Sequence, residues 1–455
     1  MARPNPERKT KWPYYWDRRI ETMPRKELQE LQDKKIRYIV RWAWENSQFH
    51  RKLWEEKAPG VTPDDIKGYA DLIKLPTYVK NDIRAIEAEN PPFGTIMSLS
   101  DSYLYKLCAS TGTTGRPTYN VWTPTEEEYG RDIMDRCWWT MMMRPGDIYY
   151  CSWRMDYHYA WGVRFYKASI RMGMKVVPIG SCPIGTSPQI MKDFINEVRP
   201  TVIGGTPSGM YSVALMLRDW GIDPPFEIVH TAGEPLPRDA RKRLQDIFNT
   251  DYVMDFFGFS EETTLNCCEC DQMIGDHWWH DASAFEIIDP DTEERLAAGE
   301  RGIFVFTSLV NHTFPMIRFN VEDTTYYIED LCPCGRTHYL FPVGIPGRQE
   351  WLVKVKDKYF LPWDVENVVR KYISDLKEYQ IVKDTPLEHP YIHIRLEPQP
   401  DKVPKNPDDW VKEWEAKLSQ ELGAPVKIDY TPPGGIPAPI WKKTYVIHKW
   451  KEKKA

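Results

Sequence analysis

The sequence predicts an α/β protein with a large N-terminal domain of layered sheets and helices and a small C-terminal α+β domain. The chain of 455 residues is longer than the roughly 250–300 residues that one hydrophobic core usually serves. Between residues 100 and 345, short apolar runs alternate with helical patterns, which is typical of layered α/β domains. After Gly347 the pattern changes, so we place the two domains at residues 1–346 and 347–455.

Within the N-terminal domain, residues 25–57 carry leucine, isoleucine and tryptophan at helical spacing and predict opening helices. Further along, short apolar runs predict strands, and the longer amphipathic stretches between them predict helices. The strands are expected at 176–179, 201–203 and 227–230, and the helices at 189–198 and 208–220.

The C-terminal domain has the clearest local signals. Asn406 is suited to cap a helix, Pro407 to its first turn, and Gly423 to its end. Apolar and polar residues alternate over 392–396, which predicts a strand with one solvated face. The expected elements are strands at 351–355, 359–361, 392–396 and 426–428, and helices at 363–376 and 406–423.

Composition and charge exclude several classes of protein. Sixty basic against 66 acidic residues give a net charge of −6, which makes a nucleic acid a poor partner. No apolar run reaches the length of about 18 residues that a membrane span needs. The polar stretch Met1–Lys9 leads into no apolar run, so we expect no secretory signal. Nine cysteines, an odd number, indicate reduced thiols in the cytoplasm.

The most informative segment runs from Ser110 to Thr118, where hydroxyls, two glycines and one cation crowd together. Glycines let the backbone turn and present N–H groups to an oxyanion, and a guanidinium suits phosphate. The alternative is an ordinary surface turn, and the pattern is not the Gly-x4-Gly-Lys-[Ser/Thr] loop. We expect a phosphate-binding loop made by Ser110, Thr111, Gly112, Thr113, Thr114, Gly115 and Arg116.

Five further segments follow this loop in order. They are Thr231-Ala232-Gly233-Glu234-Pro235, Phe257-Gly258-Phe259-Ser260-Glu261, Asp323 after Pro315-Met316-Ile317-Arg318-Phe319, Gly347-Arg348-Gln349-Glu350, and Ile436-Pro437 followed by Lys442. Each one alone also fits a turn, a helix end or a solvated charge. As an ordered set over most of the chain, they resemble the phenylacetate–coenzyme A ligase family of the acyl-adenylate-forming (ANL) superfamily.

The resemblance implies a role for each segment. Adenine contacts fall to Gly233, Glu234 and Pro235, further nucleotide contacts to Phe257, Gly258 and Ser260, a Mg²⁺ contact to Glu261, and the ribose hydroxyls to Asp323. Arg348 and Glu350 lie at a hinge to a mobile C-terminal lid, and Lys442 is the adenylation lysine, with Lys443 as a rival. The implied cofactors are ATP, Mg²⁺ and coenzyme A as co-substrate. A carboxylate that attacks the α-phosphate of ATP meets an anionic target, so cations and N–H groups must neutralise the developing charge.

A second group of residues has the chemistry of a metal site. Cys270, His277, Cys332 and Cys334 supply three thiolates and one imidazole, a set that suits a closed, structural Zn²⁺ site. The resemblance points to the same four residues. Buried cysteines without a metal are the alternative, and Cys267, Cys268 and His280 are nearby rivals.

The sequence departs from the family where the acyl pocket is formed. A segment that is usually rich in glycine carries Tyr157, His158, Tyr159 and Trp161 here. These rings could stack on an aromatic acid, or they could fill an ordinary core. Asp357 also replaces a glycine near the route of the thiol.

We therefore expect an ATP-dependent aryl or arylacetic acid–coenzyme A ligase of aromatic acid metabolism, which acts through an acyl-adenylate and releases AMP and pyrophosphate. One alternative is an adenylating enzyme that passes the acyl group to an amine or a carrier protein, which consumption of coenzyme A distinguishes. Another is a non-catalytic zinc-ribbon interaction module, which failure to bind ATP would favour. The expected partners are small molecules, with no nucleic acid and no membrane, and a homodimer is left open.

Overall fold

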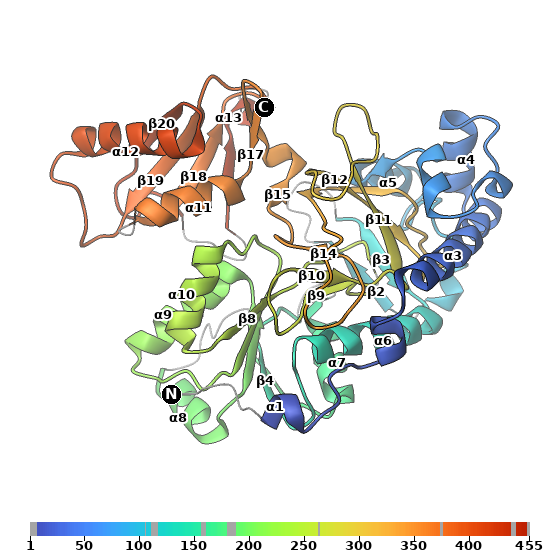
Figure 1. Cartoon of the computed structure of the whole chain (residues 1–455), viewed down its shortest axis with the longest axis horizontal. Helices are drawn as coiled ribbons and strands as arrows, with labels where there is room; N and C mark the ends of the chain where they lie inside the picture. Colours follow the sequence, from blue (N-terminus) through green and yellow to red (C-terminus); the bar gives the residue numbers. More distant parts are fainter. Residues whose placement is uncertain are drawn as a thin grey trace.

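The computed structural model of the chain describes residues 7–104, 106–110, 117–155, 161–179, 188–262, 264–373, 376–437 and 443–452. It is a mixed α/β structure in which several sheets pack with helices (Figure 1). The predicted fold class is confirmed. None of the described helices combines the length and the apolar character that a membrane span requires.

A parallel five-stranded sheet with the order β5-β4-β6-β7-β8 forms one centre of the molecule. Successive residues of a strand face opposite sides, so Val202 and Ile228 belong to a core beneath α6 and α7, and Ile203 and Val229 to a core beneath α8, α9 and α10. The strands are β4 (Ile148–Cys151), β5 (Lys175–Pro178), β6 (Val202–Gly205), β7 (Ile228–Thr231) and β8 (Tyr252–Asp255). The helices are α6 (Pro124–Thr140), α7 (Trp161–Arg171), α8 (Pro188–Val198), α9 (Pro207–Asp219) and α10 (Arg238–Phe248).

A second sheet with the order β1-β13-β12-β11 carries β15 alongside β13. Its apolar face shares a large core with the opening helices, in which Ile36 and Phe304 are fully buried. The strands are β1 (Tyr78–Val79), β11 (Ser283–Ile288), β12 (Gly302–Ser308), β13 (Phe319–Thr325) and β15 (Gly347–Arg348). The helical segments before the sheet are α1 (Glu7–Thr10), α2 (Arg18–Glu21), α3 (Arg25–Asn46), α4 (Gln48–Lys57), η1 (Pro63–Asp65), η2 (Tyr69–Lys74), α5 (Lys80–Glu89) and η3 (Asp101–Tyr103).

Two small sheets carry candidate site residues. The hairpin of β2 (Lys106–Ala109) and β3 (Tyr119–Trp122) flanks the expected phosphate loop. The sheet of β9 (Cys267–Glu269), β10 (Asp276–Trp278) and β14 (Leu340–Phe341) flanks the expected metal ligands.

The C-terminal residues form a block of their own beside α9 and α10 (Figure 1). Their four-stranded sheet has the order β20-β19-β18-β21, and its core is built only from residues between Val353 and Val446. The elements are η4 (Gln349–Trp351), β16 (Val353–Val355), β17 (Lys358–Phe360), α11 (Pro362–Tyr372), β18 (Leu376–Lys383), β19 (Ile392–Pro398), α12 (Pro407–Leu422), β20 (Val426–Tyr430), β21 (Val446–His448) and α13 (Lys449–Glu452).

The predicted caps of α12 are confirmed. The Asn406 side chain accepts a hydrogen bond from the backbone N–H of Asp408, and Gly423 is left-handed with φ 64°. The helix expected over 363–376 is shorter, because α11 ends at Tyr372 and Leu376 already pairs with Pro398 in the sheet. Sheet pairing with a distant strand ended this helix, and a local pattern does not report such pairing.

Candidate functional site

The candidate site lies at the carboxyl ends of the parallel strands, where open α/β sheets usually bind ligands. Thr231 ends β7 and Asp255 ends β8, so the expected adenine segment and the 257–261 segment leave the sheet side by side. A pocket at this edge brings together four of the segments that the sequence singles out. Its lining is Gly233, Glu234, Pro235, Asp255, Phe256, Phe257, Gly258, Asp323, Ile345, Gly347, Arg348 and Trp351.

Thr111 to Arg116 of the expected phosphate loop lie outside the described residues, but the structure describes both ends of the loop. The backbone N–H of Ser110 donates to the carbonyl of Thr118 (2.9 Å), and the N–H of Thr118 donates to the Ser110 hydroxyl (3.0 Å). Both residues are buried. The hairpin therefore closes the base of the loop.

Glu261 lies next to this hairpin and is buried. Its carboxylate accepts a hydrogen bond from the Thr118 hydroxyl (3.1 Å) and pairs with the Lys80 ammonium. Burial raises the pKa of Glu261, but Lys80 and the hydrogen bonds outweigh burial, so the pKa lies below its ordinary value. The neighbouring carbonyl of Ser260 accepts a hydrogen bond from the Asn120 side chain. Glu261 is thus a fixed carboxylate at the base of the expected phosphate loop.

Lys80 is a site residue that the sequence analysis missed. It is the first residue of α5, whose N-terminal turn has no other cation. A cation at a helix N-terminus opposes the helix dipole, and that mismatch is the one signal that could have drawn attention to it. Its partner Glu261 is far away in the sequence, so only the fold brings the two together.

Asp323 and Arg348 face each other across the pairing of β13 with β15. The Arg348 guanidinium lies 3.4 Å from the Asp323 carboxylate, and it donates to the carbonyl of Val321 (3.3 Å). Burial lowers the pKa of Arg348, but Asp323 and neighbouring carboxylates raise it above its ordinary value overall. The expected hinge segment therefore reaches the expected ribose contact directly.

Asp255 at the pocket belongs to a buried carboxylate cluster that the sequence analysis also missed. Glu269 forms two hydrogen bonds with Arg241 (2.6 and 2.8 Å), and it accepts the backbone N–H of Asp255 (2.7 Å). Burial, together with the charge of Glu269, raises the pKa of Asp255 to about 8, and the pKa of Asp276 is raised as well. Burial and mutual repulsion therefore favour the protonated form of the Asp255–Asp276 pair.

This pKa shift predicts a pH dependence of stability. Because the folded-state pKa of Asp255 is above the unfolded value, its contribution is present below about pH 4 and is lost as the pH rises towards 8. The free energy of unfolding should fall over this interval by up to about 1.4 kcal/mol per pH unit. Urea unfolding at several pH values measures it. Asp255→Asn should reduce this slope, and Asp276, whose pKa is also raised, should supply the remainder. The exposed Asp251→Asn should leave the slope unchanged, and an unchanged slope in Asp255→Asn would contradict the assignment.

The expected metal ligands Cys270, His277, Cys332 and Cys334 meet at one buried point, with ligand atoms all within 4.8 Å of one another. The Cys270 and Cys332 sulfurs are 3.7 Å apart, and the Cys334 sulfur lies 3.3 Å from Nε2 of His277. A disulfide needs about 2.05 Å, whereas Zn–S bonds of about 2.3 Å place tetrahedral sulfurs about 3.8 Å apart. The four side chains therefore fit a closed, tetrahedral coordination site for one metal ion.

The three rivals for this site point elsewhere. The Cys267 thiol donates to the carbonyl of Phe257 (3.1 Å), and the Cys268 thiol to the carbonyl of Cys137 (3.6 Å). Nδ1 of His280 lies 2.9 Å from the carbonyl of Trp278.

Tyr157, His158 and Tyr159 lie outside the described residues, whereas Trp161 begins α7 and is buried. A Cβ built on Gly258 would lie 3.4 Å from the Trp161 ring, and the ring packs against Phe165 with centroids 5.7 Å apart. Trp161 therefore forms a wall next to Gly258, which lines the pocket.

Lys442 also lies outside the described residues, but its rival Lys443 is described. The Lys443 ammonium pairs with Glu378 (2.6 Å) and lies over the rings of Tyr379 and Tyr445. Its backbone N–H donates a hydrogen bond to the carboxylate of Glu234 (2.6 Å), which lines the pocket. The ammonium of Lys443 is therefore paired within the C-terminal block.

Glu350 follows Arg348 in η4, close to the pocket. Its carboxylate pairs with Lys451 (2.9 Å), and its carbonyl accepts a hydrogen bond from the Lys383 ammonium (2.7 Å). The expected hinge residue thus contacts two segments of the C-terminal block. The ion pair of Arg301 with Asp364 (2.8 Å) also links the chain before residue 347 to α11 of the C-terminal block.

Comparison with known proteins gives a consistent set of relatives. The profile of the AMP-binding enzyme family matches residues 50–309. The phenylacetate-coenzyme A ligase of Thermus thermophilus is 29% identical over 370 residues, 80% of each chain. That of Aromatoleum evansii is 27% identical over 428 residues, 92% of this chain and 93% of the relative.

Two solved structures show the same fold in different states. The crystal structure of 2-hydroxyisobutyryl-CoA ligase in the postadenylation state in complex with 2-HIB-AMP has a TM-score of 0.87 and 24% identity, and the match covers 97% of this chain and 94% of that one. The same ligase in complex with 2-HIB-AMP and CoA in the thioesterification state has a TM-score of 0.71 and 25% identity, with coverages of 97% and 96%. The TM-score is thus higher for the postadenylation structure than for the thioesterification structure.

Proposed function

The chain belongs to the family of AMP-binding enzymes, and from this membership we propose that it is an ATP-dependent ligase that joins an aryl or arylacetic acid to coenzyme A. The observation that carries the proposal is the pocket itself. Residues near 233, 258, 323 and 348, far apart in the sequence, line one cavity at the carboxyl edge of the sheet. Phenylacetate-coenzyme A ligases among the relatives support the choice of acid and thiol.

The reaction proceeds in two steps. The substrate carboxylate attacks the α-phosphorus of ATP, the bond to the pyrophosphate breaks, and an acyl-adenylate forms. A thiolate then attacks the acyl carbon, and AMP leaves. In the first step Ser110 to Arg116 bind phosphate, Gly233 to Pro235 and Phe257 to Ser260 surround the adenine end, and Asp323 holds the ribose. Glu261 is the carboxylate suited to Mg²⁺, which would neutralise the phosphate charge when bound.

We assign the adenylation lysine to Lys442 and a lid domain to residues 347–455, with Arg348 and Glu350 at its hinge. Lys443 has its ammonium bound by Glu378, and its backbone N–H contacts Glu234 at the pocket, which supports Lys442 rather than Lys443 for this role. The Cys270, His277, Cys332 and Cys334 set would hold a structural Zn²⁺. The eight buried free cysteines of the described residues and the substrates suit the cytoplasm, and a homodimer stays a prediction.

A panel of carboxylic acids tests the function, with release of AMP and consumption of coenzyme A measured separately. AMP release together with thioester formation from an aromatic acid is the expected result. Release of AMP without consumption of coenzyme A would favour transfer to an amine or a carrier protein. Absence of ATP binding would end the proposal.

The same panel tests the acid pocket, to which we assign Tyr157, His158, Tyr159 and Trp161. Because the Trp161 ring lies against Gly258, Trp161→Ala should open space and shift preference towards a bulkier acid. The Michaelis constant for the native acid should rise by about two- to tenfold, as expected for a lost aromatic contact, with that for ATP unchanged. Trp54→Ala, which removes a buried ring from the core of the opening helices, is the control. The same rank order of acids in Trp161→Ala would show that this wall is ordinary core.

Lys80 supplies a cation at the phosphate end of the site. Lys80→Met should slow isotope exchange between pyrophosphate and ATP by about 100-fold, the size seen when one preorganised electrostatic contact is lost. Lys80→Arg should restore part of the rate. Lys74→Met, which removes a half-exposed lysine paired with Asp71, is the control, and equal rates in Lys80→Met and wild type would exclude a role in the first step.

A further inference from the structure

Lys383 on β18 is a buried cation of the C-terminal block. Its ammonium donates to the carbonyl of Glu350 (2.7 Å) and to that of Leu352 (2.6 Å). Burial lowers the pKa of Lys383 to about 8, and the charge of Glu350 opposes that shift only in part. A buried ammonium is costly unless it is well hydrogen-bonded, and here both bonds go to one short stretch of backbone. The side chain therefore holds the chain on both sides of Trp351.

Trp351 lies between these two carbonyls and contacts two parts of the molecule. It lines the pocket at the carboxyl edge of the parallel sheet, together with Asp323 and Arg348. Its ring also packs against Tyr445, with centroids 5.8 Å apart, and Tyr445 is buried in the core of the C-terminal block. Trp351 thus joins the wall of the pocket to the core of this block.

The same core reaches the segment that follows the proposed adenylation lysine. The Lys443 ammonium lies 4.6 Å from the centroid of the Tyr445 ring. The backbone N–H of Lys443 donates to Glu234, another residue of the pocket (2.6 Å). The pocket therefore meets the C-terminal block at Trp351 and at Lys443, and both of these residues contact Tyr445.

A change at the hinge would disturb the contacts of Lys383. One ammonium holds the carbonyls of Glu350 and Leu352, so a change in the backbone angles of Trp351 would move these carbonyls relative to each other and break at least one hydrogen bond. A hydrogen bond from a charged donor is stronger than a neutral one. Lys383 therefore favours the arrangement in which Trp351 lines the pocket.

We propose that Lys383 is a positioning residue of the first half-reaction and that it acts through Trp351. It holds the backbone so that the Trp351 ring stays between the pocket and Tyr445, and this contact keeps the segment after the adenylation lysine next to the nucleotide. The inference rests on the proposed function, in which the pocket binds ATP and the C-terminal block supplies that lysine. The second half-reaction does not use the lysine, so it does not need this arrangement.

A double-mutant cycle tests whether Lys383 acts through Trp351. Lys383→Met and Trp351→Ala should each slow the isotope exchange between pyrophosphate and ATP about five- to tenfold, as expected for one lost aromatic contact or charged hydrogen bond. The double variant should be no slower than the slower single variant, because one ring carries both effects. Losses that multiply would overturn the proposal. A wild-type rate in Trp351→Ala would also overturn it, whether or not Lys383→Met folds.

The second half-reaction separates positioning from a merely structural role. Conversion of a supplied acyl-adenylate to the thioester should stay within about twofold of the wild-type rate in Lys383→Met and in Trp351→Ala. Trp351→Phe, which retains a ring, should restore most of the exchange rate. Equal losses in both half-reactions would contradict the proposal.

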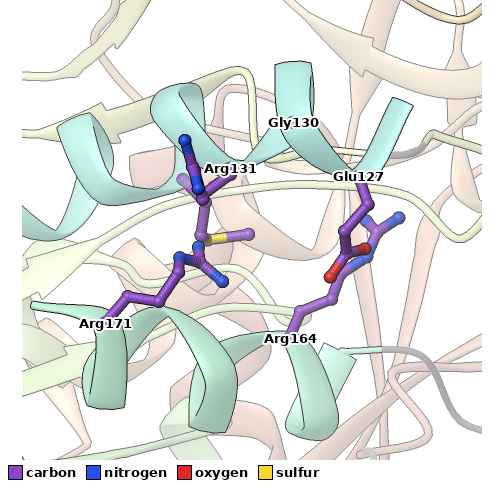
Figure 2. A pocket seen from close by; sticks show the side chains of 6 residues that line it. Glu127, Gly130, Arg131, Arg164 and Arg171 are labelled. Atoms are coloured by element: carbon purple, nitrogen blue, oxygen red, sulfur yellow. The ribbon is translucent and has the colours of Figure 1, made fainter. Parts of the chain in front are cut away.

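Two variants serve as controls. Lys427→Met removes an exposed lysine of β20, in the same sheet as Lys383, and it should behave like wild type. Arg171→Met removes the ion pair with Asp135 (2.7 Å) at the end of α7, in the groove between α6 and α7 (Figure 2). It should lower the unfolding temperature but not the exchange rate. A loss of exchange in Arg171→Met equal to that in Lys383→Met would attribute both losses to stability and overturn the proposal.

Amide hydrogen exchange gives a readout that does not depend on catalysis. The backbone N–H of Leu352 donates to the carbonyl of Gln349 (3.1 Å). With AMP present, this amide should exchange about tenfold more slowly in wild type than in Lys383→Met, and equal protection in both would exclude Lys383 as the residue that holds the segment. Absence of adenylation with any acid in wild type would refute the proposed function, and the amide measurement would still report on Lys383.

Discussion

Lys442→Ala is expected to abolish formation of AMP from acid and ATP, with a loss of at least about 100- to 1,000-fold in the exchange of pyrophosphate with ATP. The reason is that a single ammonium that reaches both reactants neutralises charge that develops only during the first step. Conversion of a supplied acyl-adenylate to the thioester should stay close to the wild-type rate, because the lysine has no part in the second step. The two half-reactions are measured separately on the purified full chain.

Lys443→Ala is the matched control for this experiment. It removes the ion pair with Glu378 and the ring contacts with Tyr379 and Tyr445, but it retains the backbone N–H that meets Glu234. We expect a lower unfolding temperature with adenylation largely retained. Loss of adenylation in Lys443→Ala together with retention in Lys442→Ala would reverse the assignment, and equal loss of both half-reactions in Lys442→Ala would refute a role restricted to adenylation.

Cys334→Ser is expected to remove zinc from the purified protein and to lower its stability by on the order of 3 kcal/mol or more. The site joins the loop after β9 to the segment at 332–334, so loss of the ion would release two segments that are distant in the sequence. The Cys334 region also carries the buried ion pair of Arg336 with Glu21 (2.7 Å) and accepts a hydrogen bond from Tyr15 (2.8 Å). Metal analysis and thermal unfolding measure the two effects.

Cys268→Ser is the control for the metal site, because Cys268 is also buried but directs its thiol to the carbonyl of Cys137. It should keep its zinc. Wild-type protein without zinc, or equal zinc contents in Cys334→Ser and wild type, would leave the four residues as a cluster of buried thiols and one imidazole.

The elements that the sequence predicted best are those with local causes. The caps at Asn406 and Gly423 and the alternation over 392–396 act within a few residues, and α12 and β19 follow them. Where pairing with a distant strand decides the end of an element, the local pattern does not predict that end. The end of α11 near Tyr372 is an example.

The candidate site was likewise predicted in part from the sequence and decided in part by the fold. Residue type and spacing singled out Cys270, His277, Cys332 and Cys334, but three further candidates remained, and the directions of their side chains excluded those. The order of the motifs predicted an adenylating site, and the carboxyl edge of the parallel sheet explains why distant motifs meet there.

The sequence by itself determined the fold class, the order of the motifs and the chemistry of the expected metal ligands, because those depend on local hydrogen bonding, hydrophobic periodicity and residue type. Only the tertiary structure paired Lys80 with Glu261, placed Lys443 against Glu378 and raised the pKa of Asp255. Each of these depends on burial and on charges that lie far apart in the chain. The desolvation and the distance that decide them are properties of the packed molecule.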